Sequence, residues 1–312
     1  GSAFGRGGYV VESYLNGIQP YQVVSKPYGV ESRCEEAIQK VSECLLELQN
    51  KFEKDNKEIG EVIFDIFGFS TDQWGLGEMK SMVTSTGGLV FMHEEFNDQL
   101  FKDNFKNYFG LNDFSELKVA SGGTLTMHVS PPLLIKGALG PLQAIPNKSK
   151  QAAKEKIGEG ETNQWFLGGL DQNLSYTFIL ELISGKNVKP ADNNAYVQFA
   201  TKYKHPSGAI FQRVTTMVRS YLDQSTPIQF LGGVDQETVI AVYSKLAARK
   251  SFETDSVPVI RWLDRVLIST MKKFSNFRKG DKGSFQICEE LYLLPQFFYY
   301  LRKSSLVRKF AT

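Results

Sequence analysis

The side chains most able to carry chemistry crowd into one short stretch, residues 72–80, with the sequence Asp-Gln-Trp-Gly-Leu-Gly-Glu-Met-Lys. Two acids and a lysine lie there beside glycines 75 and 77, and a glycine pair follows at 87 and 88. Glycine has no Cβ and tolerates positive φ, so these positions allow tight turns. Charged side chains on such a backbone are typical of an active-site loop, provided that the rest of the chain supplies catalytic partners.

Those partners are not recognisable in the sequence. It contains no GxxxxGK[ST] phosphate loop, no GxSxG nucleophile elbow and no HExxH zinc motif. His93, His128 and His205 fall in three separate segments, and the three cysteines are scattered without a CxxC pair. We therefore predict that this chain is not an enzyme, that it has no catalytic residue, metal site or other cofactor, and that its thiols are reduced as in a cytosolic protein.

The composition is that of a soluble protein of two or three domains. The chain has 312 residues, of which 42% are hydrophobic and 22% are charged. The sequence has no apolar run of the ~18 residues that suggest a transmembrane helix. Its first residues lack the basic and apolar regions of a secretory signal. We therefore expect a cytoplasmic location.

The net charge of +2 hides an asymmetry along the chain. Residues 226–312 hold 14 Lys and Arg against 8 Asp and Glu, a net charge of +6, which leaves −4 for residues 1–225. Such a cationic end can meet an anionic membrane or an acidic protein face. The alternative is an ordinary solvated helix face.

The first third of the chain has an α/β pattern. Residues 33–53 carry apolar side chains at spacings of three and four, which predicts an amphipathic helix. Residues 61–69 form a continuous apolar run, as in a strand covered on both faces of a parallel sheet. A second helix is expected over 94–108, which completes a helix, strand, helix order. Five apolar side chains should share one side of that helix: Phe96, Leu100, Phe101, Phe105 and Phe109.

The middle of the chain changes to a period of two. Leu125, Met127 and Val129 alternate with polar residues, so they should face one side of a strand over 123–129. Several strands in about a hundred residues favour a β-sandwich. Three further strands are expected at 176–182, 196–203 and 208–219, the last two joined by a hairpin loop at 205–208.

From about residue 225 the period is helical. Asp235 is suited to cap a helix over 236–250. Pro258 suits the first position of a second helix that ends at Phe274, and more helix is expected within 289–310. The side chains expected to be buried in the first two helices are Val239, Val242, Leu246, Trp262, Leu263, Val266, Leu267 and Met271.

Three blocks of the sequence, in this order, resemble the GTPase-activating subunit of the COPII inner coat, the Sec23 family. The resemblance covers nearly the whole chain from about residue 8. The blocks are residues 72–80 with Thr86-Gly-Gly88; 157–165, 203–208 and 213–216; and Phe230, 235–237, Arg261-Trp-Leu-Asp-Arg265, 273–274, 294–297 and 301–305.

The resemblance implies a multidomain protein of α/β, all-β and all-α parts. A partial von Willebrand A-like trunk would occupy residues 1–110, a β-sandwich 111–223, and the start of a helical domain 224–312. The family's zinc finger would lie upstream and its gelsolin-like domain, with the catalytic arginine finger, downstream. Zinc is therefore expected in the full-length protein and not in this chain, and no arginine of this chain is the finger.

The implied function is GTPase activation during COPII transport from the endoplasmic reticulum to the Golgi. The expected partners are a Sar-type small GTPase, a cargo-adaptor subunit, an outer-coat subunit and an anionic membrane surface, with no nucleic acid. The protein would be cytoplasmic and peripheral on the endoplasmic reticulum membrane and on COPII vesicles. Three alternatives stay open: a non-catalytic cargo-adaptor scaffold of the same architecture, a paralogue that stimulates the GTPase without building coats, and a metal-dependent adhesion module of von Willebrand type, whose DxSxS motif would lie upstream.

Two sets of candidate site residues follow from the resemblance. The resemblance implies that the charged stretch at 72–80 is the strand-to-helix turn of a binding trunk rather than an active site. Its candidates for GTPase or partner contact are Asp72, Gln73, Glu78 and Lys80. The candidates for a membrane-facing basic surface are Lys272, Lys273, Arg278, Lys279, Arg302 and Lys303.

Overall fold

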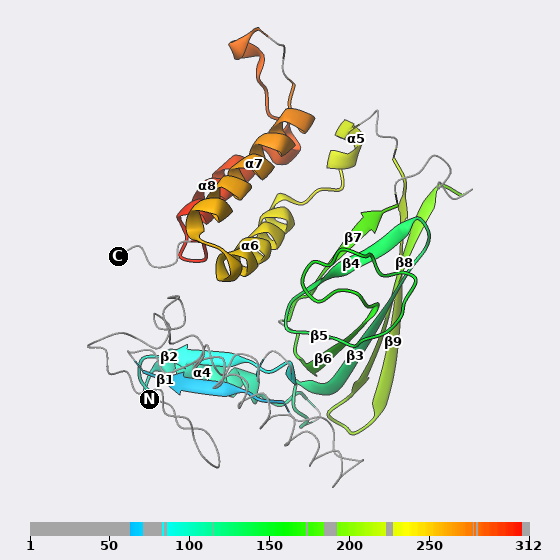
Figure 1. Cartoon of the computed structure of the whole chain (residues 1–312). Helices are drawn as coiled ribbons and strands as arrows, with labels where there is room; N and C mark the ends of the chain where they lie inside the picture. The colour runs from blue at the N-terminus through cyan, green and yellow to red at the C-terminus, as the bar shows by residue number, and fades with distance from the viewer. Residues whose placement is uncertain are drawn as a thin grey trace, which may run out of the picture. The chain divides into compact units, whose positions relative to one another are not determined.

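The chain divides into two compact units, residues 1–219 and 220–312, which are described separately (Figure 1). The structure is a computed structural model. It describes residues 63–70, 83, 86–113, 115–172, 174–183, 192–222, 227–276, 278 and 280–307. The predicted helix at 33–53 and the charged stretch at 72–80 lie outside the described residues.

The first unit begins with a small α/β segment. Strands β1 (Ile66–Phe69) and β2 (Val90–His93) pair in parallel, with Phe67 opposite Phe91. Helix α4 (Gln99–Tyr108) follows. It starts five residues later than the sequence predicted, because the Asp98 side chain accepts a hydrogen bond from Leu100 N and caps the helix there.

An aromatic cluster joins α4 to the two strands. The Phe67 ring stacks on Phe91 at 5.0 Å, and Phe101 meets Phe69 edge-on at 4.6 Å. Of the five side chains predicted to share one side of α4, Leu100 is 61% exposed and Phe96 70% exposed. Phe96 still contacts the ring of Phe69. Leu100 lies outside the cluster, so it was wrongly included among the side chains predicted to share this side of the helix.

Asp65 holds the same segment together through polar contacts. Its two carboxylate oxygens accept hydrogen bonds from Leu89 N and from the Tyr108 hydroxyl, both at 2.8 Å. Burial, followed by the contact with Asp65, raises the pKa of the Tyr108 hydroxyl well above its ordinary value. The end of α4 is therefore tied to the start of both strands.

The second part of this unit is a β-sandwich, as predicted. One sheet has five strands in the order β5-β6-β3-β8-β9, and the other has two, β4 and β7. β9 is an edge strand of the larger sheet, and all its residues are exposed. The strands are β3 (Ala120–Val129), β4 (Leu133–Leu139), β5 (Gln143–Ala144), β6 (Gln164–Leu170), β7 (Thr177–Leu182), β8 (Asn194–Lys204) and β9 (Ile210–Ser220).

The sandwich core confirms the predicted alternation in β3. Leu125, Met127 and Val129 are all buried between the sheets, while His128 is exposed. They pack around Trp165 of β6, which is fully buried and donates its indole N–H to Glu159 O at 2.9 Å. The predicted hairpin also forms, since His205 N donates to Ala209 O between β8 and β9.

Two glycine pairs bring the α/β segment and the sandwich into backbone contact. A Cβ placed on Gly168 of β6 would lie 1.9 Å from Thr86 O, and one on Gly87 would lie 2.1 Å from Leu167 O. Both residues have positive φ, +63° and +67°. Gly88 in turn passes so close to the segment before β1 that a Cβ there would lie 1.9 Å from Phe64 O. Only glycine satisfies both the spacing and the backbone angle at Gly87 and Gly168.

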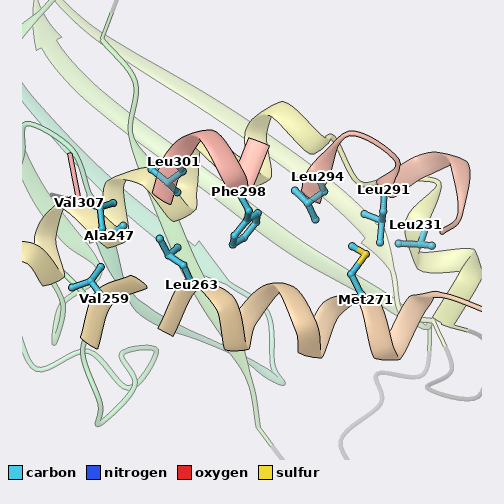
Figure 2. Packing of buried hydrophobic residues seen from close by; sticks show 10 residues of the cluster. All are labelled: Leu231, Ala247, Val259, Leu263, Met271, Leu291, Leu294, Phe298, Leu301 and Val307. Atoms are coloured by element: carbon cyan, nitrogen blue, oxygen red, sulfur yellow. The ribbon is translucent and has the colours of Figure 1, made fainter. Parts of the chain in front are cut away.

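The second unit is helical. It contains α5 (Pro227–Leu231), α6 (Gln236–Glu253), α7 (Ser256–Phe274), two short 3₁₀ turns, η1 (Lys282–Ser284) and η2 (Glu289–Leu291), and α8 (Leu294–Lys303). Figure 2 shows the packing: Val259, Leu263 and Met271 of α7 point toward Leu294, Phe298 and Leu301 of α8. Ala247 of α6, Leu231, Leu291 and Val307 complete this core.

The helical predictions hold with two corrections. Asp235 caps α6 by accepting from Thr238 N, as predicted, and Leu263 and Met271 are buried. However, Pro258 is the third residue of α7 rather than the first; it is tolerated because the N–H groups of a first helical turn have no intrahelical partner. In α6 the fully buried residue is Ala247, whereas Val242 and Leu246 are only half-buried.

A substitution at Gly168 tests the glycine contact. We expect Gly168→Ala to destabilise the full chain by about 3 kcal/mol or more, because the new Cβ overlaps a carbonyl oxygen and the residue must keep a positive φ. Gly208→Ala is the matched control: Gly208 has φ +86° but nothing within 4 Å of its Cβ position, so only the backbone cost of roughly 1–2 kcal/mol applies. Urea unfolding measures the loss of stability in both variants. Equal losses would show that the close approach of Gly168 to Thr86 O does not contribute to the cost.

Candidate interaction surfaces

The described residues contain no recognisable catalytic centre. No group of three or more His, Cys, Asp or Glu among them could hold a metal ion. His93 contacts the Asp98 carboxylate at 3.0 Å beside the α4 cap, and His205 lies in the hairpin turn, where its Nδ1 accepts from Ser207 N. Within the part of the chain that is described, no helix has the length and apolar character needed to cross a bilayer.

The first set of predicted contact residues cannot be placed. Asp72, Gln73, Glu78 and Lys80 lie outside the described residues, so their partner-facing role stays a prediction. The motif's second half is described, and its glycines are structural, since Gly87 and Gly88 make the close backbone contacts with β6 and with Phe64.

The Arg261-Trp-Leu-Asp-Arg265 block divides into a structural centre and two exposed ends. Leu263 is fully buried in the helical core. Trp262 is half-buried, with the Tyr243 ring at 5.9 Å and the Lys250 Nζ 5.2 Å from its centroid. Asp264 forms an ion pair with Arg302 of α8, with 3.1 Å between Oδ1 and Nε.

Arg261 and Arg265 lie on the outer face of the same helix. Both are exposed, and they are four residues apart, so they are neighbours on one side of α7. These two arginines carry part of the family resemblance but are not among the basic site residues predicted from the sequence. Their i, i+4 spacing beside the buried Leu263 was the signal that could have identified them.

The six predicted basic residues separate into two groups. Lys272 and Lys273, in the last turn of α7, are exposed, as is Arg278 in the loop that follows; Lys279 lies outside the described residues.

The two basic residues of α8 are engaged within the unit. Arg302 pairs with Asp264, and Lys303 donates to the Tyr299 hydroxyl while its Nζ lies 4.3 Å from the centre of that ring. The Lys303 contact lowers the pKa of the Tyr299 hydroxyl. Lys303 is nonetheless exposed, as are Lys272 and Lys273, and the membrane-facing role of these residues stays a prediction.

Three family models match the chain in order. The Sec23/Sec24 trunk domain matches residues 31–109, the Sec23/Sec24 beta-sandwich domain matches 120–222, and the Sec23/Sec24 helical domain matches 235–312.

Two named proteins illustrate the similarity. The protein transport protein SEC23 F of Arabidopsis thaliana is 38% identical over 251 residues, which cover 80% of this chain and 32% of the relative. The crystal structure of the human COPII-coat protein Sec24c matches with a TM-score of 0.60 at 16% identity, over 93% of this chain and 32% of that chain. The chain thus spans about a third of the length of each, and the match to Sec24c shows the fold alone.

Single substitutions in the 261–265 block test its division. We expect Leu263→Ala to destabilise the full chain by about 2–5 kcal/mol, because it removes buried contacts and leaves a cavity. Asp264→Asn should cost at most about 1 kcal/mol, since the Asp264–Arg302 pair is partly exposed to solvent. Arg261→Ala and Arg265→Ala should change the unfolding free energy by less than about 0.5 kcal/mol. Urea unfolding of the four variants measures these changes. A large loss of unfolding free energy on substitution of either arginine would show that this arginine is also needed for the fold.

Proposed function

Since the chain belongs to the Sec23/Sec24 family, whose trunk, β-sandwich and helical domains it carries in order, we propose that it is part of a GTPase-activating subunit of the COPII vesicle coat. The observation that carries this proposal is the 38% identity to a relative named SEC23, sustained over 80% of the chain. The solved Sec24c structure shares the fold at only 16% identity. The identity therefore favours the activating branch of the family over the cargo-adaptor branch.

In this proposal the described residues bind and orient the small GTPase, but they supply no catalytic group for GTP hydrolysis. An arginine finger accelerates GTP hydrolysis by placing positive charge on the phosphoryl group as charge develops in the transition state. No arginine of this chain is assigned that role, and the finger is expected in a segment outside these residues. The α/β segment, locked to the sandwich by its glycines, would supply a rigid surface for the small GTPase.

The proposed partners and location follow from the same family. We propose a Sar-type small GTPase, a cargo-adaptor subunit and an outer-coat subunit as protein partners, and a peripheral position on the endoplasmic reticulum membrane and its vesicles. Zinc would belong to a separate finger of the full-length protein. Among the described residues, no three His, Cys, Asp or Glu side chains lie together in a group that could hold a metal ion, so no zinc site is proposed there.

Two other functions fit the same fold. A cargo-adaptor scaffold would share all three domains without stimulating the GTPase. A paralogue could instead stimulate the GTPase without assembling a coat. The rate of GTP hydrolysis by the small GTPase distinguishes the scaffold from the proposed activator. A coat-assembly assay distinguishes the paralogue from it.

The test is single-turnover GTP hydrolysis by a purified Sar-type GTPase. The full-length protein that contains this chain should raise the hydrolysis rate by on the order of 10³-fold or more, the usual effect of an arginine finger. Residues 1–312 alone should bind the GTP-loaded GTPase in a pull-down without accelerating hydrolysis, because this proposal assigns the finger to a segment outside these residues. The GDP-loaded GTPase serves as the control for nucleotide-dependent binding.

Absence of acceleration by the full-length protein would reject the activator. If the protein then still bound a COPII cargo-adaptor or outer-coat subunit, the scaffold alternative would replace it. Acceleration by residues 1–312 alone would show instead that a catalytic group lies within this chain.

A further inference from the structure

Strand β9 is a long edge strand without the features that usually protect such an edge. It lies at one end of the larger sheet, where β8 is the one strand of the described chain that pairs with it (Figure 1). It has 11 residues, about twice the usual length of a strand, and all of them are exposed. Edge strands are commonly kept short or carry proline or lysine, because their unpaired N–H and C=O groups can pair with another chain. β9 has no proline and no lysine, so it presents an open edge.

The β8–β9 hairpin determines which backbone groups point to this open edge. His205 N donates to Ala209 O at 2.8 Å. Farther along the hairpin, the Gln198 amide donates to the Thr216 hydroxyl at 3.0 Å, which fits the same register. In an antiparallel pair, residues that hydrogen-bond to the neighbouring strand alternate with residues whose N–H and C=O point the other way. The groups that point to the open edge are therefore those of residues 210, 212, 214, 216 and 218.

The order of apolar and polar residues along β9 is symmetric about Val214. From residue 210 to residue 218 the strand has two apolar residues, two polar residues, Val214, two polar residues and two apolar residues. The five apolar side chains are between 41% and 68% exposed: Ile210, Phe211, Val214, Met217 and Val218. Two copies of this strand, placed antiparallel about an axis at Val214, would therefore match apolar side chains with apolar ones.

We propose that β9 is a dimer interface, at which it pairs antiparallel with β9 of a second copy of this chain about a two-fold axis at Val214. Such an interface is isologous, because the same surface of both copies meets itself. Ile210 then faces Val218 of the partner subunit, and Phe211 faces Met217 of the partner subunit. Side chains directly opposite each other in an antiparallel pair are about 5 Å apart and pack together. The inference goes beyond the proposed function and does not depend on it.

The backbone at the axis suits this pairing. Val214 is one of the residues whose N–H and C=O point to the open edge. Two residues that face each other in this orientation exchange two hydrogen bonds. Val214 and Val214 of the partner subunit can therefore form such a pair, and the larger sheets of the two copies would continue across the axis.

The match is specific to one register. An axis at Thr215 would place Phe211 opposite Arg219. An axis at Arg213 would place two arginines directly opposite each other, which is unfavourable for like charges. The axis at Val214 pairs every apolar side chain of β9 with another apolar side chain.

The charges of β9 favour a second copy over an acidic strand as the occupant. In the symmetric register Arg213 faces Thr215 of the partner subunit, so no two arginines lie directly opposite each other. The Arg219 guanidinium donates to Val218 O of its own strand at 2.8 Å. An acidic strand would therefore meet Arg213 as the one arginine of β9 not turned to its own backbone, whereas a second copy matches all five apolar side chains.

The test is sedimentation of the full-length protein that contains this chain, over about 1–100 µM. The wild type should form a dimer in this range. Val214→Lys should weaken the dimer at least about tenfold, because it places two cations about 5 Å apart at the axis. Val214→Glu should weaken it in the same way. An equimolar mixture of the two variants should dimerise again, since opposite charges then meet at the axis.

Leu182→Lys is the matched control. Leu182 ends β7 of the smaller sheet and is 54% exposed, so the change introduces the same charge at a similar apolar position. This variant should dimerise like the wild type. Thermal unfolding of all three variants should be close to that of the wild type, because both positions are exposed. Equal weakening by Leu182→Lys would show that added charge, and not the β9 contact, controls association.

Cysteine cross-linking tests the register. In the proposed dimer, Cα atoms at position 214 are about 5.5 Å apart, so Val214→Cys should cross-link to itself with a short bis-maleimide. Thr216→Cys is on the same face of the same strand, but its two copies would be about 14 Å apart and should cross-link much less. The wild type measures the background from Cys34, Cys44 and Cys288.

A full-length protein that stays monomeric at about 100 µM would overturn the proposal. Slow amide hydrogen exchange at the even-numbered residues of β9 in that monomer would then show that another segment of the polypeptide covers the edge. Dimerisation that neither Val214 variant weakens would overturn it too, because the dimer would then use another surface. None of these measurements includes a GTPase, so failure of the proposed function would leave their outcome unchanged.

Discussion

The close approach of two backbones at Gly87 and Gly168 is the constraint on which the first unit depends. Each glycine occupies a position where a Cβ would lie about 2 Å from a carbonyl oxygen of the other segment. Because this contact joins an α/β segment to a sandwich strand, the two parts cannot slide without leaving it. Gly88 extends the same close packing to Phe64, in the segment just before β1. A surface formed by the α/β segment is thereby held at a defined position on the sandwich.

Helix α7, the longest described helix of the helical unit, has one buried side and one exposed side. The inner side of α7 meets α8 through Leu263 and Phe298, both almost fully buried. Its outer side carries arginines at the i, i+4 spacing. Because the inner side of α7 is packed in the core, the spacing of its outer side chains is set by helix geometry. The ion pair from Asp264 to Arg302 uses one charge to join α7 and α8 and leaves Arg261 and Arg265 exposed.

Strong local periodicity made much of the fold predictable. The alternation of Leu125, Met127 and Val129 predicted β3, and Asp235 predicted the start of α6. Strands β4 and β6 were not predicted, because glycines and buried residues interrupt their alternation: β6 reads Gln-Trp-Phe-Leu-Gly-Gly-Leu. Their pairing partners are distant in sequence, so only long-range contacts specify them. The buried face of α6 was misplaced for a similar reason, since small Ala247 fits the core where larger residues would not.

The sequence by itself determined the order of α/β, β-sandwich and helical parts and the family to which they belong, because period and motif order are local properties of the chain. Only the tertiary structure decided what the motifs do. It showed that Gly87 serves a backbone contact with a strand eighty residues later, and that Asp264 binds Arg302 on another helix. It also showed that Lys303 donates a hydrogen bond to the Tyr299 hydroxyl on its own helix. Charge type and spacing can be read along a sequence, but whether a charge is paired depends on residues that folding brings beside it.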